Sequence, residues 1–409
     1  MHEAWIIDVA RTPRGIGKIG KGALGDIHPQ RLLSTVLRAL AERNGVDTAE
    51  VDDVVAGCNT QAGKQGLCIA RMAALDAGYN QAAPGFSLDR FCGSGLTAVN
   101  LAAMGVLAGV QQLVIAGGVE SMSHNSTLQR ESMLDSGNLE LRRRIPQPHQ
   151  GVCADLIATL EQFTRKDLDD LALESQRRAY VAIKEGRFSR SLVPVLDAEG
   201  NVLLAQEEYP RPQTTAETLA QLKPAFSAVW EREIDAHGNT YGSLVRQAYP
   251  DVEINHLHTA GTSSGVVDGA GAVLIASPEY ARAHGLKPRA RVIALTTAGD
   301  DPTLMLNGPV PATKKALAQA GMTIGDIDLF EVNEAFAVVP LKFMRDLDID
   351  PARVNVNGGA MALGHPIGAT GAMILGTLLD ELERRDLQVG LATLCSAGGM
   401  APATIIERM

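Results

Sequence analysis

The strongest constraint on the fold of this 409-residue chain is a repeat between its two ends. Near the N-terminus stand ALAERNGVDTAEVDDVVAG, FCGSGLTAV and VIAGGVES, and near the C-terminus stand the similar ALAQAGMTIGDIDLFEVN, GHPIGATGA and CSAGGMAP. Matched positions in these three pairs are 276, 273 and 281 residues apart, and the second pair aligns Cys92 with His365. Chance similarity would scatter the separations more widely, so the sequence indicates two copies of one unit.

Strand-like and helix-like stretches alternate within each copy. Short apolar runs such as AWIIDVA, QLVIAGG and IDLFEVN read as strands, whereas PQRLLSTVLRALAERNG and ATKKALAQAG read as helices. This alternation predicts an α/β layered fold. We expect residues 1–120 with 257–280 to form the first copy, residues 281–409 to form the second, and the more polar residues 121–256 to form an inserted lid domain.

Composition excludes several function classes. A formal net charge of −10 disfavours nucleic acid and anionic membrane surfaces as partners, so an anionic ligand would need a local basic patch. The run Arg142 to Arg144 is expected to be a solvated face. Five widely spaced cysteines fit neither a disulfide framework nor a zinc site, and no stretch is apolar enough to span a membrane. We therefore expect a cytoplasmic protein.

Cys92 and His365 are the first candidate catalytic residues. Cys92 precedes an expected helix start, where free N–H groups and the helix dipole would lower its pKa and favour the thiolate. The small residues after it would let a carbonyl group approach the backbone. As the repeat partner of Cys92, His365 would be the base that activates the thiol. A buried inert thiol and a structural histidine are the alternatives.

Cys395 and Asn333 end apolar strands in the second copy. Cys395 is followed by small residues in CSAGGM, and Asn333 lies in EVNEAFA, where its amide could orient a water or donate to an oxyanion. A core cysteine and a strand-to-helix cap are the alternatives for these two residues.

Two further patterns carry no site by this interpretation. GIGKIG, residues 15–20, matches a dinucleotide-binding pattern, but the lysines and glycines that follow leave no helix to receive a pyrophosphate. His256 and His258 have alternate strand spacing without an accompanying carboxylate or cysteine, so we expect no metal there or elsewhere.

With these residues in place, the chain resembles the thiolases, in particular acetyl-CoA acetyltransferases and 3-ketoacyl-CoA thiolases. The resemblance covers nearly the whole chain, through DVARTPRG, FCGSG, AGGVESMS, LKPAF, EVNEAFA, NGGAMALGHPIGATG and CSAGGM in this order. It implies a duplicated five-layer α-β-α-β-α core with an inserted loop domain. It also implies transfer of acyl groups between coenzyme A thioesters in fatty acid metabolism.

The resemblance implies a role for each candidate. Cys92 would carry the acyl group as a thioester after His365 activates it, and Cys395 would move the proton on the α-carbon of acetyl-CoA. Asn333, through a water, and His365 would hold the enolate oxygen. Backbone N–H groups of Cys92 and Ala397 would form a second oxyanion hole, although the family usually has glycine at the latter position. No cofactor is implied, because acetyl-CoA, acyl-CoA and coenzyme A are substrates.

Contacts with coenzyme A are also carried over from the family. The residues expected along the coenzyme A channel and the acyl and pantetheine walls are His149, Lys223, Ser264, Met305, Phe336, Ala397 and Gly398. The stretch PHQGVCAD departs from the family pattern H-M-G-x-T-A-E at Cys153 and Asp155, and the region between Phe226 and Ala260 is enlarged by some two dozen residues. The first departure leaves acyl preference open, and the enlarged region could reshape either the pocket mouth or a subunit contact.

Family members are dimers or tetramers, so a homodimer or homotetramer is expected. Two other functions remain open from the sequence. One is a decarboxylating β-ketoacyl synthase of the same fold, which Cys395 argues against. The other is a catalytically silent coenzyme A or lipid carrier, which the intact Cys92, His365 and Cys395 disfavour.

Overall fold

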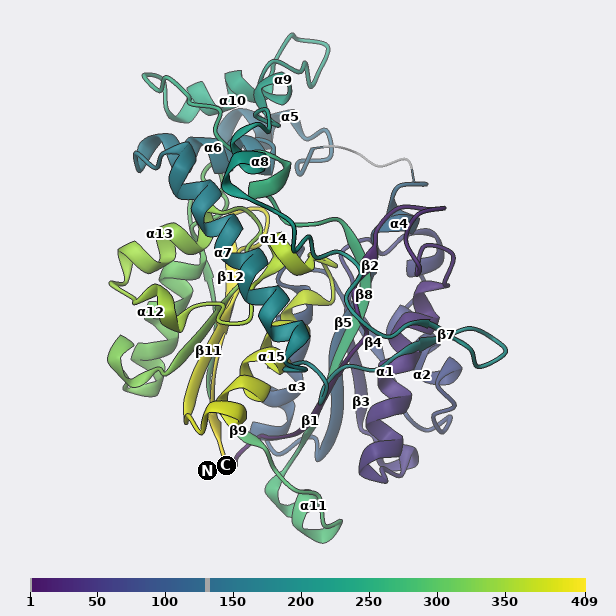
Figure 1. The fold of residues 1–409 in the computed structure, drawn as a ribbon. Helices are drawn as coiled ribbons and strands as arrows, with labels where there is room; N and C mark the ends of the chain where they lie inside the picture. Colours follow the sequence, from purple (N-terminus) through teal and green to yellow (C-terminus); the bar gives the residue numbers. More distant parts are fainter. Residues whose placement is uncertain (1, 129–132) are drawn as a thin grey trace.

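A computed structural model describes residues 2–128 and 133–409; residues 1 and 129–132, which belong to the expected first copy and lid, lie outside the described residues. Within the described part, ten strands form one mixed sheet in the order β10-β11-β12-β9-β1-β8-β5-β3-β4, with β2 paired to β8 (Figure 1). A two-stranded sheet pairs β6 with β7. The strands are β1 (Trp5–Arg11), β2 (Gly15–Ile16), β3 (Asp53–Gly57), β4 (Phe86–Leu88), β5 (Leu113–Ser121), β6 (Val195–Leu196), β7 (Val202–Leu204), β8 (Val267–Ala276), β9 (Ala290–Gly299), β10 (Leu329–Val332), β11 (Val389–Thr393) and β12 (Met400–Arg408).

Helices flank and separate these strands. The α-helices of the described chain are α1 (Pro29–Asn44), α2 (Ile69–Asp76), α3 (Ser94–Leu107), α4 (Met122–Asn125), α5 (Leu139–Arg144), α6 (Gln150–Leu160), α7 (Arg165–Lys184), α8 (Ala216–Ala220), α9 (Ser227–Trp230), α10 (Tyr241–Ala248), α11 (Pro278–Ala283), α12 (Pro309–Ala320), α13 (Val338–Asp346), α14 (Ala360–Leu363) and α15 (Thr370–Arg385).

The two halves of the main sheet have the same topology. In the first half the order is β1-β8-β5-β3, and in the second it is β9-β12-β11-β10. The matched neighbours also pair alike: β3 with β5 and β10 with β11 are parallel, whereas the other matched pairs are antiparallel. Gly45 and Gly321 end the matched helices α1 and α12 in the left-handed conformation, with φ of 60° and 67°. Glycine adopts this conformation without the steric cost of a Cβ atom.

The layers follow the five-layer expectation. Helices α3 and α15 pack against each other and against strands of both halves, while α1 and α2 cover the outer face of one half and α12 covers the outer face of the other. Residues 370–382 of α15 are all buried, and most of α3 is buried, because helices between two sheets are covered on most sides. Hydrogen bonding also joins the two half-sheets at one end, where β1 pairs with β9 through Trp5 and Ile6.

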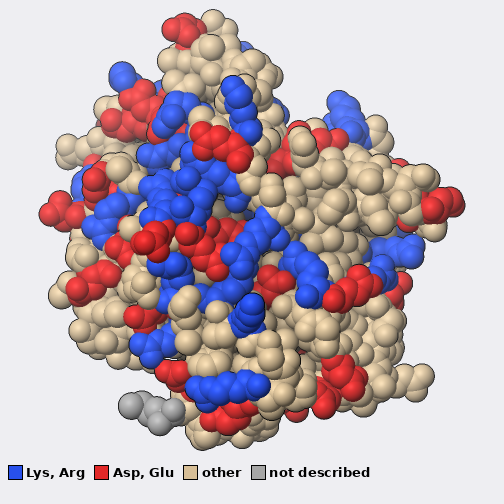
Figure 2. Space-filling model, turned by 60° about the horizontal axis from the view of Figure 1, so that its bottom comes forward, with Lys and Arg blue, Asp and Glu red and all other residues tan. Residues whose placement is uncertain are grey.

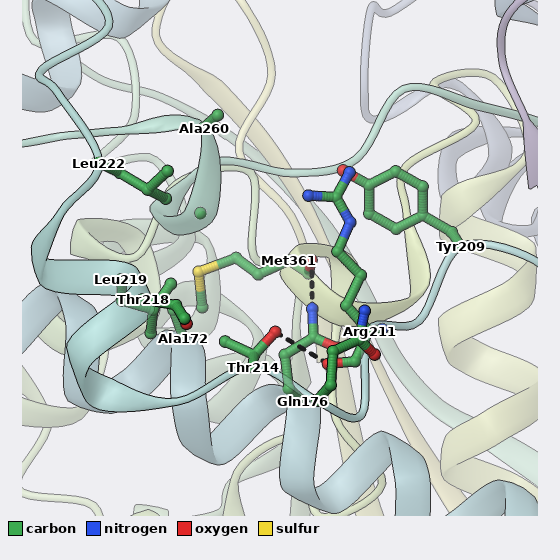
Figure 3. Close-up of a pocket in the computed structure, with 12 residues that line it drawn as sticks. Ala172, Gln176, Tyr209, Arg211, Thr214, Thr218, Leu219, Leu222, Ala260 and Met361 are labelled. Carbon is green, nitrogen blue, oxygen red and sulfur yellow. Dashed lines mark hydrogen bonds between the residues drawn. The ribbon is translucent and has the colours of Figure 1, made fainter.

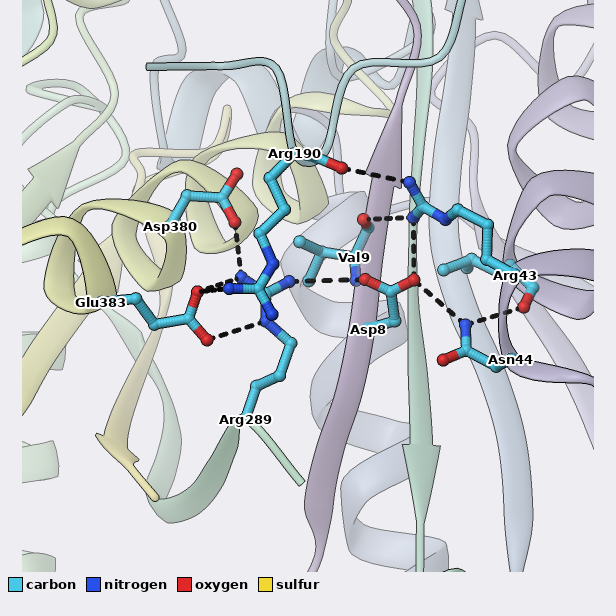
Figure 4. Close-up of polar contacts among 9 residues, drawn as sticks. Asp8, Val9, Arg43, Asn44, Arg190, Arg289, Asp380 and Glu383 are labelled. Atoms are coloured by element: carbon cyan, nitrogen blue, oxygen red, sulfur yellow. Dashed lines mark hydrogen bonds and ion pairs between the residues drawn. The ribbon is translucent and has the colours of Figure 1, made fainter. Parts of the chain in front are cut away.

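A charged cluster reinforces this junction (Figure 4). Arg289, which immediately precedes β9, contacts Asp380 and Glu383 of α15 at 2.6 and 2.7 Å and Asp8 of β1 at 3.4 Å. Asp8 in turn accepts from Arg43 of α1 at 2.9 Å. The guanidinium of Arg289 is almost fully buried, so these carboxylates compensate a charge that water cannot reach. The cluster therefore ties elements of the first half to the second.

In Figure 1, helices α5, α6, α8, α9 and α10 of the stretch between β5 and β8 gather at the top of the view, away from the β1–β9 junction, and α7 runs diagonally from them across the front. On the face shown in Figure 2, Lys and Arg gather but alternate with Asp and Glu. Many arginines of the described chain are paired in this way, as in Arg178 with Glu174 and Arg385 with Glu381. Among the described residues, no helix combines the length and apolar character needed to cross a membrane.

Candidate active site

Cys92 lies in a tight turn between β4 and α3. The hydroxyl of Ser94 accepts from the Arg90 N–H at 2.8 Å and donates to the Phe91 carbonyl at 2.6 Å, which closes the turn. Phe91 itself adopts a left-handed conformation with φ of 50°. A Cβ atom at Gly93 would lie 2.4 Å from the Ser396 hydroxyl, so only glycine lets the turn approach the segment that carries Cys395. The turn thus brings the two cysteine segments together.

The ionisation of Cys92 differs from the expectation. Burial raises the pKa of the Cys92 thiol to about 12, and the negative charge of Glu120 acts in the same direction. Helix α3 begins only at Ser94, and Cys92 is 9% exposed, so desolvation of the thiolate outweighs the helix dipole. The resting group is therefore a neutral thiol that needs a base.

His365 is held in one tautomer. Its Nδ1 lies 2.6 Å from the Thr370 hydroxyl, and that hydroxyl donates to the Pro366 carbonyl at 2.9 Å. Because the hydroxyl has one proton, it must accept from Nδ1–H, which leaves Nε2 with a free lone pair. Burial lowers the pKa of His365 to about 3, with the charge of Arg14 acting in the same direction. His365 is thus a neutral imidazole with Nε2 available as a proton acceptor.

The amide of Asn333 is a hydrogen-bond partner of this nitrogen, because its Nδ2 can donate to the Nε2 lone pair. Its Nδ2 lies 3.4 Å from Nε2 of His365, and its buried Oδ1 has no partner among the described residues. The neighbouring Asn355 accepts from the Val332 N–H and donates to the Val332 carbonyl, both at 2.8 Å, which fixes the end of β10. The Asn333 amide follows this fixed strand end directly, so it can orient a water or a substrate oxygen.

Cys395 follows β11 and is 1% exposed. Its pKa is raised by burial and by negative charge on Cys92, so the second thiol is also neutral and lies close enough to sense the first. The backbone N–H of Ala397 donates to no acceptor in the described chain, and the N–H of Cys92 meets only its own thiol. Such unsatisfied donors are what a developing oxyanion needs.

A cavity of about 260 Å³ opens onto Cys92. Met305, which adopts a left-handed conformation with φ of 61°, forms part of its wall. His149 caps α6 by accepting from the Gly151 N–H at 3.1 Å, and burial lowers its pKa to about 4. The lining residues are Asn59, Phe91, Cys92, Leu134, Gln147, Pro148, His149, Gln150, Tyr241, Met305, Ile367 and Ala397.

Other residues expected at the site lie outside this cavity. Phe336 is buried in an aromatic row, with its ring centroid 5.7 Å from that of Phe226, which in turn lies 5.8 Å from His149. Ser264 is half-buried and donates its N–H to the Ala335 carbonyl, while Lys223 is exposed and does not line the cavity. Gly398 has a φ of 76°, a conformation that glycine adopts readily.

A second cavity, also of about 260 Å³, is lined by residues of α7, α8 and the segment 209–214 (Figure 3). Its wall includes Leu222, which precedes Lys223, and Ala260, four residues before Ser264, together with Tyr209 and Met361. The Arg211 guanidinium stacks over the Tyr209 ring at 5.4 Å and has no carboxylate partner in the described chain. This cavity therefore offers an unpaired cation beside apolar and aromatic surface.

Several residues that position the site escaped the sequence analysis. Glu120 is fully buried and accepts from the N–H groups of Asn59 and Gly368, so it fixes the loop after His365. Its position in VIAGGVES, a charge at the end of an apolar strand, was the available signal. Thr370 also escaped notice, although its partners His365 and Pro366 are only five and four residues away, and Tyr241 could not be found because it meets His149 from a distant segment.

Two expectations about charged residues were wrong. Asp155 of α6 accompanies the paired histidines, since its carboxylate lies 3.0 Å from Nδ1 of His256 and 2.9 Å from Nδ1 of His258. These histidines are in an irregular segment, not a strand. Arg142 is buried rather than solvated, because Asp135 and Asp235 both pair with it. No group of three or more metal-ligating side chains suited to an ion is found in the parts of the chain described.

Comparison with known proteins identifies the family. The model of the thiolase N-terminal domain matches residues 4–229, and that of the thiolase C-terminal domain matches residues 286–408. The chain is 39% identical to an acetyl-CoA acetyltransferase of Thiocystis violacea, covering 99% of this chain and 98% of the relative. It is 40% identical to a beta-ketoadipyl-CoA thiolase of Escherichia coli over the full length of both.

A solved structure agrees in fold as well as in sequence. The crystal structure of the Bacillus anthracis acetyl-CoA acetyltransferase superposes with a TM-score of 0.85 at 36% identity, covering 100% of this chain and 99% of the other. Together with the family models, this match covers both repeated halves and the segment between them. The chain belongs to the thiolase family.

Proposed function

We propose that this acyl-CoA C-acyltransferase works by a ping-pong mechanism through an acyl-Cys92 intermediate. The activity would be thiolysis of a 3-ketoacyl-CoA, or the reverse Claisen condensation of acetyl-CoA with an acyl-CoA. The observations that support the proposal are that Cys92, His365 and Cys395 are buried and uncharged, that Cys395 is close enough to Cys92 to sense its charge, and that the segments after Cys92 and His365 pack closely, since a Cβ atom at Gly95 would lie 2.7 Å from the Gly368 carbonyl. Family membership supplies the class of reaction.

In thiolysis, Nε2 of His365 would take the thiol proton as the sulfur of Cys92 attacks the 3-keto carbon. The bond between the α-carbon and that carbon then breaks, which leaves an acyl thioester on Cys92 and the enolate of acetyl-CoA. The Cys395 thiol would give its proton to the α-carbon of the enolate. Its raised pKa suits it to this role, because it holds a proton at neutral pH.

Coenzyme A would complete the cycle. Its thiol attacks the acyl group on Cys92, its proton passes to the Cys395 thiolate, and the proton held on His365 returns to the Cys92 sulfur. All protons are then back in their starting places. The unpaired amide oxygen of Asn333 could accept from a water that donates to the enolate oxygen, and the free N–H of Ala397 could donate to the tetrahedral intermediate on Cys92, which supports two oxyanion sites. Stabilising an enolate is the demanding part, since each tenfold in rate corresponds to about 1.4 kcal/mol.

Coenzyme A is proposed to enter from the cavity of Figure 3 and to reach Cys92 past the aromatic row of Phe226 and Phe336. The unpaired Arg211 would face a phosphate, and exposed Lys223 could serve the same group at the mouth. Ser264 and His149 would border the pantetheine, whereas Met305, Ala397 and Gly398 would lie near the acyl side.

The wider organisation remains part of the proposal. Residues 1–120 with 257–280 and residues 281–409 would be the two thiolase halves, and residues 121–256 would be the loop domain that binds coenzyme A. We further propose a cytoplasmic homodimer or homotetramer that uses coenzyme A thioesters without a cofactor. Strand β4 lies at the edge of the main sheet, and Phe86 on it is 40% exposed. An edge strand can pair with another chain, which supports the proposal of a partner subunit.

The test is a panel of 3-ketoacyl-CoA thiolysis rates combined with mass mapping of acyl adducts. Cys92→Ala should abolish turnover and adduct formation, whereas Cys395→Ala should block turnover but still be acylated at residue 92. Cys68→Ala, which removes an exposed thiol far from the cavity lining, is the matched control and should behave as the parent. Acylation at another residue would contradict the assigned roles. Turnover of malonyl but not acetyl donors would favour a decarboxylating synthase, and no adduct at all would favour a silent carrier.

A further inference from the structure

The segment 227–256, which is longer than the family pattern requires, packs as a small unit on α6. Helices α9 and α10 share an apolar cluster with α6 in which Trp230 and Leu244 meet Val152 and Leu156. The fit is close, because a Cβ atom at Gly242 would lie 2.5 Å from the Trp230 ring. The segment is therefore held by a core of its own rather than lying loosely over the surface.

Polar contacts fix the same segment at two further places. Asp235 pairs with the buried Arg142 of α5 at 2.8 Å. At the end of the segment, the fully buried Asp155 of α6 accepts from the N–H groups of Leu257 and His258 and contacts both histidine rings. Because α6 also begins at His149 in the cavity wall, the segment has a defined position relative to Cys92.

This packing presents one side chain of the segment to the cavity that contains Cys92. Tyr241, the first residue of α10, is 1% exposed and lines the cavity together with Met305. Its ring meets the His149 ring edge-on at 5.7 Å, and the Arg232 guanidinium lies 5.2 Å from its centroid. The ring is thus restrained from two sides. The cavity that it borders has a volume of about 260 Å³, which is smaller than the pockets that hold drug-sized ligands.

We propose that Tyr241 is a specificity-determining residue that closes the acyl pocket and selects short-chain 3-ketoacyl-CoA substrates over long-chain ones. The inference rests on the proposed function, because the acyl group must be attached to Cys92. Other residues of the wall, such as Phe91 and Met305, belong to the two halves of the core, whereas Tyr241 comes from the enlarged segment. The segment 227–256 therefore supplies part of the pocket wall through Tyr241.

The test compares kcat/KM for acetoacetyl-CoA and 3-oxohexadecanoyl-CoA in the parent and in variants. Tyr241→Ala opens a space on the order of a benzene ring, ~150 Å³. We expect the ratio of long-chain to short-chain kcat/KM to rise about tenfold or more, since one or two methylenes in an apolar pocket already discriminate about 10–200-fold. Tyr241→Phe keeps the ring and should keep the parent ratio. The matched control is Tyr249→Ala, because Tyr249 is the C-cap of α10 in the same segment and does not line the cavity.

Each result has one meaning. An unchanged ratio in folded Tyr241→Ala, or an equal shift in Tyr249→Ala, overturns the inference while leaving the proposed function intact. If Tyr241→Ala does not fold, Tyr241→Leu provides the same comparison with a smaller loss of packing. If the parent cleaves neither substrate and Cys92 forms no adduct, the proposed function fails first. A ratio that shifts in Tyr241→Phe as strongly as in Tyr241→Ala would assign selection to the hydroxyl and also overturn the proposal.

Discussion

Replacing Thr370 with valine tests whether the tautomer of His365 is set by a single hydroxyl. Valine has nearly the same shape, but it cannot accept from Nδ1–H, which the Thr370 hydroxyl does at 2.6 Å. Both side chains are buried, so water cannot replace the lost acceptor. An unsatisfied buried donor costs about 1–3 kcal/mol. The neutral imidazole can avoid this cost by moving its proton to Nε2, where the unpartnered Oδ1 of Asn333 could accept it after rotation of the amide.

The tautomer shift removes the base from Cys92, and a proton kept on Nδ1 without an acceptor disfavours the imidazolium that must form when Nε2 takes the thiol proton. A cost of about 1–3 kcal/mol corresponds to a fall of roughly 5- to 150-fold in the acylation rate, at about 1.4 kcal/mol per tenfold. The assay is the single-turnover rate of Cys92 acylation by acetyl-CoA, with ¹⁵N chemical shifts of the His365 ring reporting the tautomer. We expect kcat to fall with little change in KM, and Thr370→Ser to restore the rate because it returns the hydroxyl.

A purely structural role for Thr370 predicts a different pattern. Valine would then lower the unfolding temperature while leaving the acylation rate of folded protein and the ring nitrogen shifts as in the parent. That result would refute the tautomer assignment, as would a Thr370→Ser variant no faster than valine.

Three further predictions concern stability. The pKa of His365 is about 3 in the folded protein and near 6.5 in the unfolded chain. Its neutral form therefore stabilises the fold fully above pH 6.5, and this stabilisation is lost as the pH falls toward 3, by up to about 1.4 kcal/mol per pH unit. His365→Asn should reduce the loss of unfolding free energy at acid pH in urea titrations, and equal pH slopes in parent and variant would contradict the assignment. Asp155→Ala leaves its buried donors without an acceptor and should lower the free energy of unfolding by about 3 kcal/mol or more, with Asp155→Asn losing less. Glu207→Gln removes the carboxylate between the buried Arg11 and Arg14 and should cost about 3–5 kcal/mol by the same measurement, whereas a loss below 1 kcal/mol would mean that the two guanidinium groups find other partners.

The layered fold was predictable because the repeat consists of local sequence signals for helices, strands and turns. Glycine stops such as Gly45 and Gly321, apolar strands and helix starts recur in both halves, and each depends mainly on neighbours in the chain. The pairing of β1 with β9 was not predictable in this way, since it joins residues nearly 300 positions apart. The fold class thus follows from sequence pattern, and the junction between the half-sheets follows from tertiary packing.

Residue identity and the repeat suggested candidate reactive groups, which stay predictions, but not their ionisation. A helix start was expected to lower the pKa of Cys92, yet the pKa depends on how much water reaches the sulfur, and burial is a tertiary property. The same limit explains why Asp155 was not associated with His256 and His258, about a hundred residues away. Arg142 was misjudged for a similar reason, since one of its carboxylates, Asp235, lies in the enlarged segment.

The buried, uncharged resting state has a consequence for how the site can react. A thiolate and an imidazolium formed together at this centre would each be poorly solvated, so the pair is costly until a substrate carbonyl is present to receive the sulfur. When the sulfur attacks, its charge passes to the carbonyl oxygen, which the free N–H groups near Cys92 and Ala397 can stabilise. In the proposed mechanism, proton transfer to His365 and bond formation to carbon would therefore be coupled by desolvation. A site of this kind should keep its thiol inert toward water-borne electrophiles while remaining reactive toward a thioester that fits the cavity.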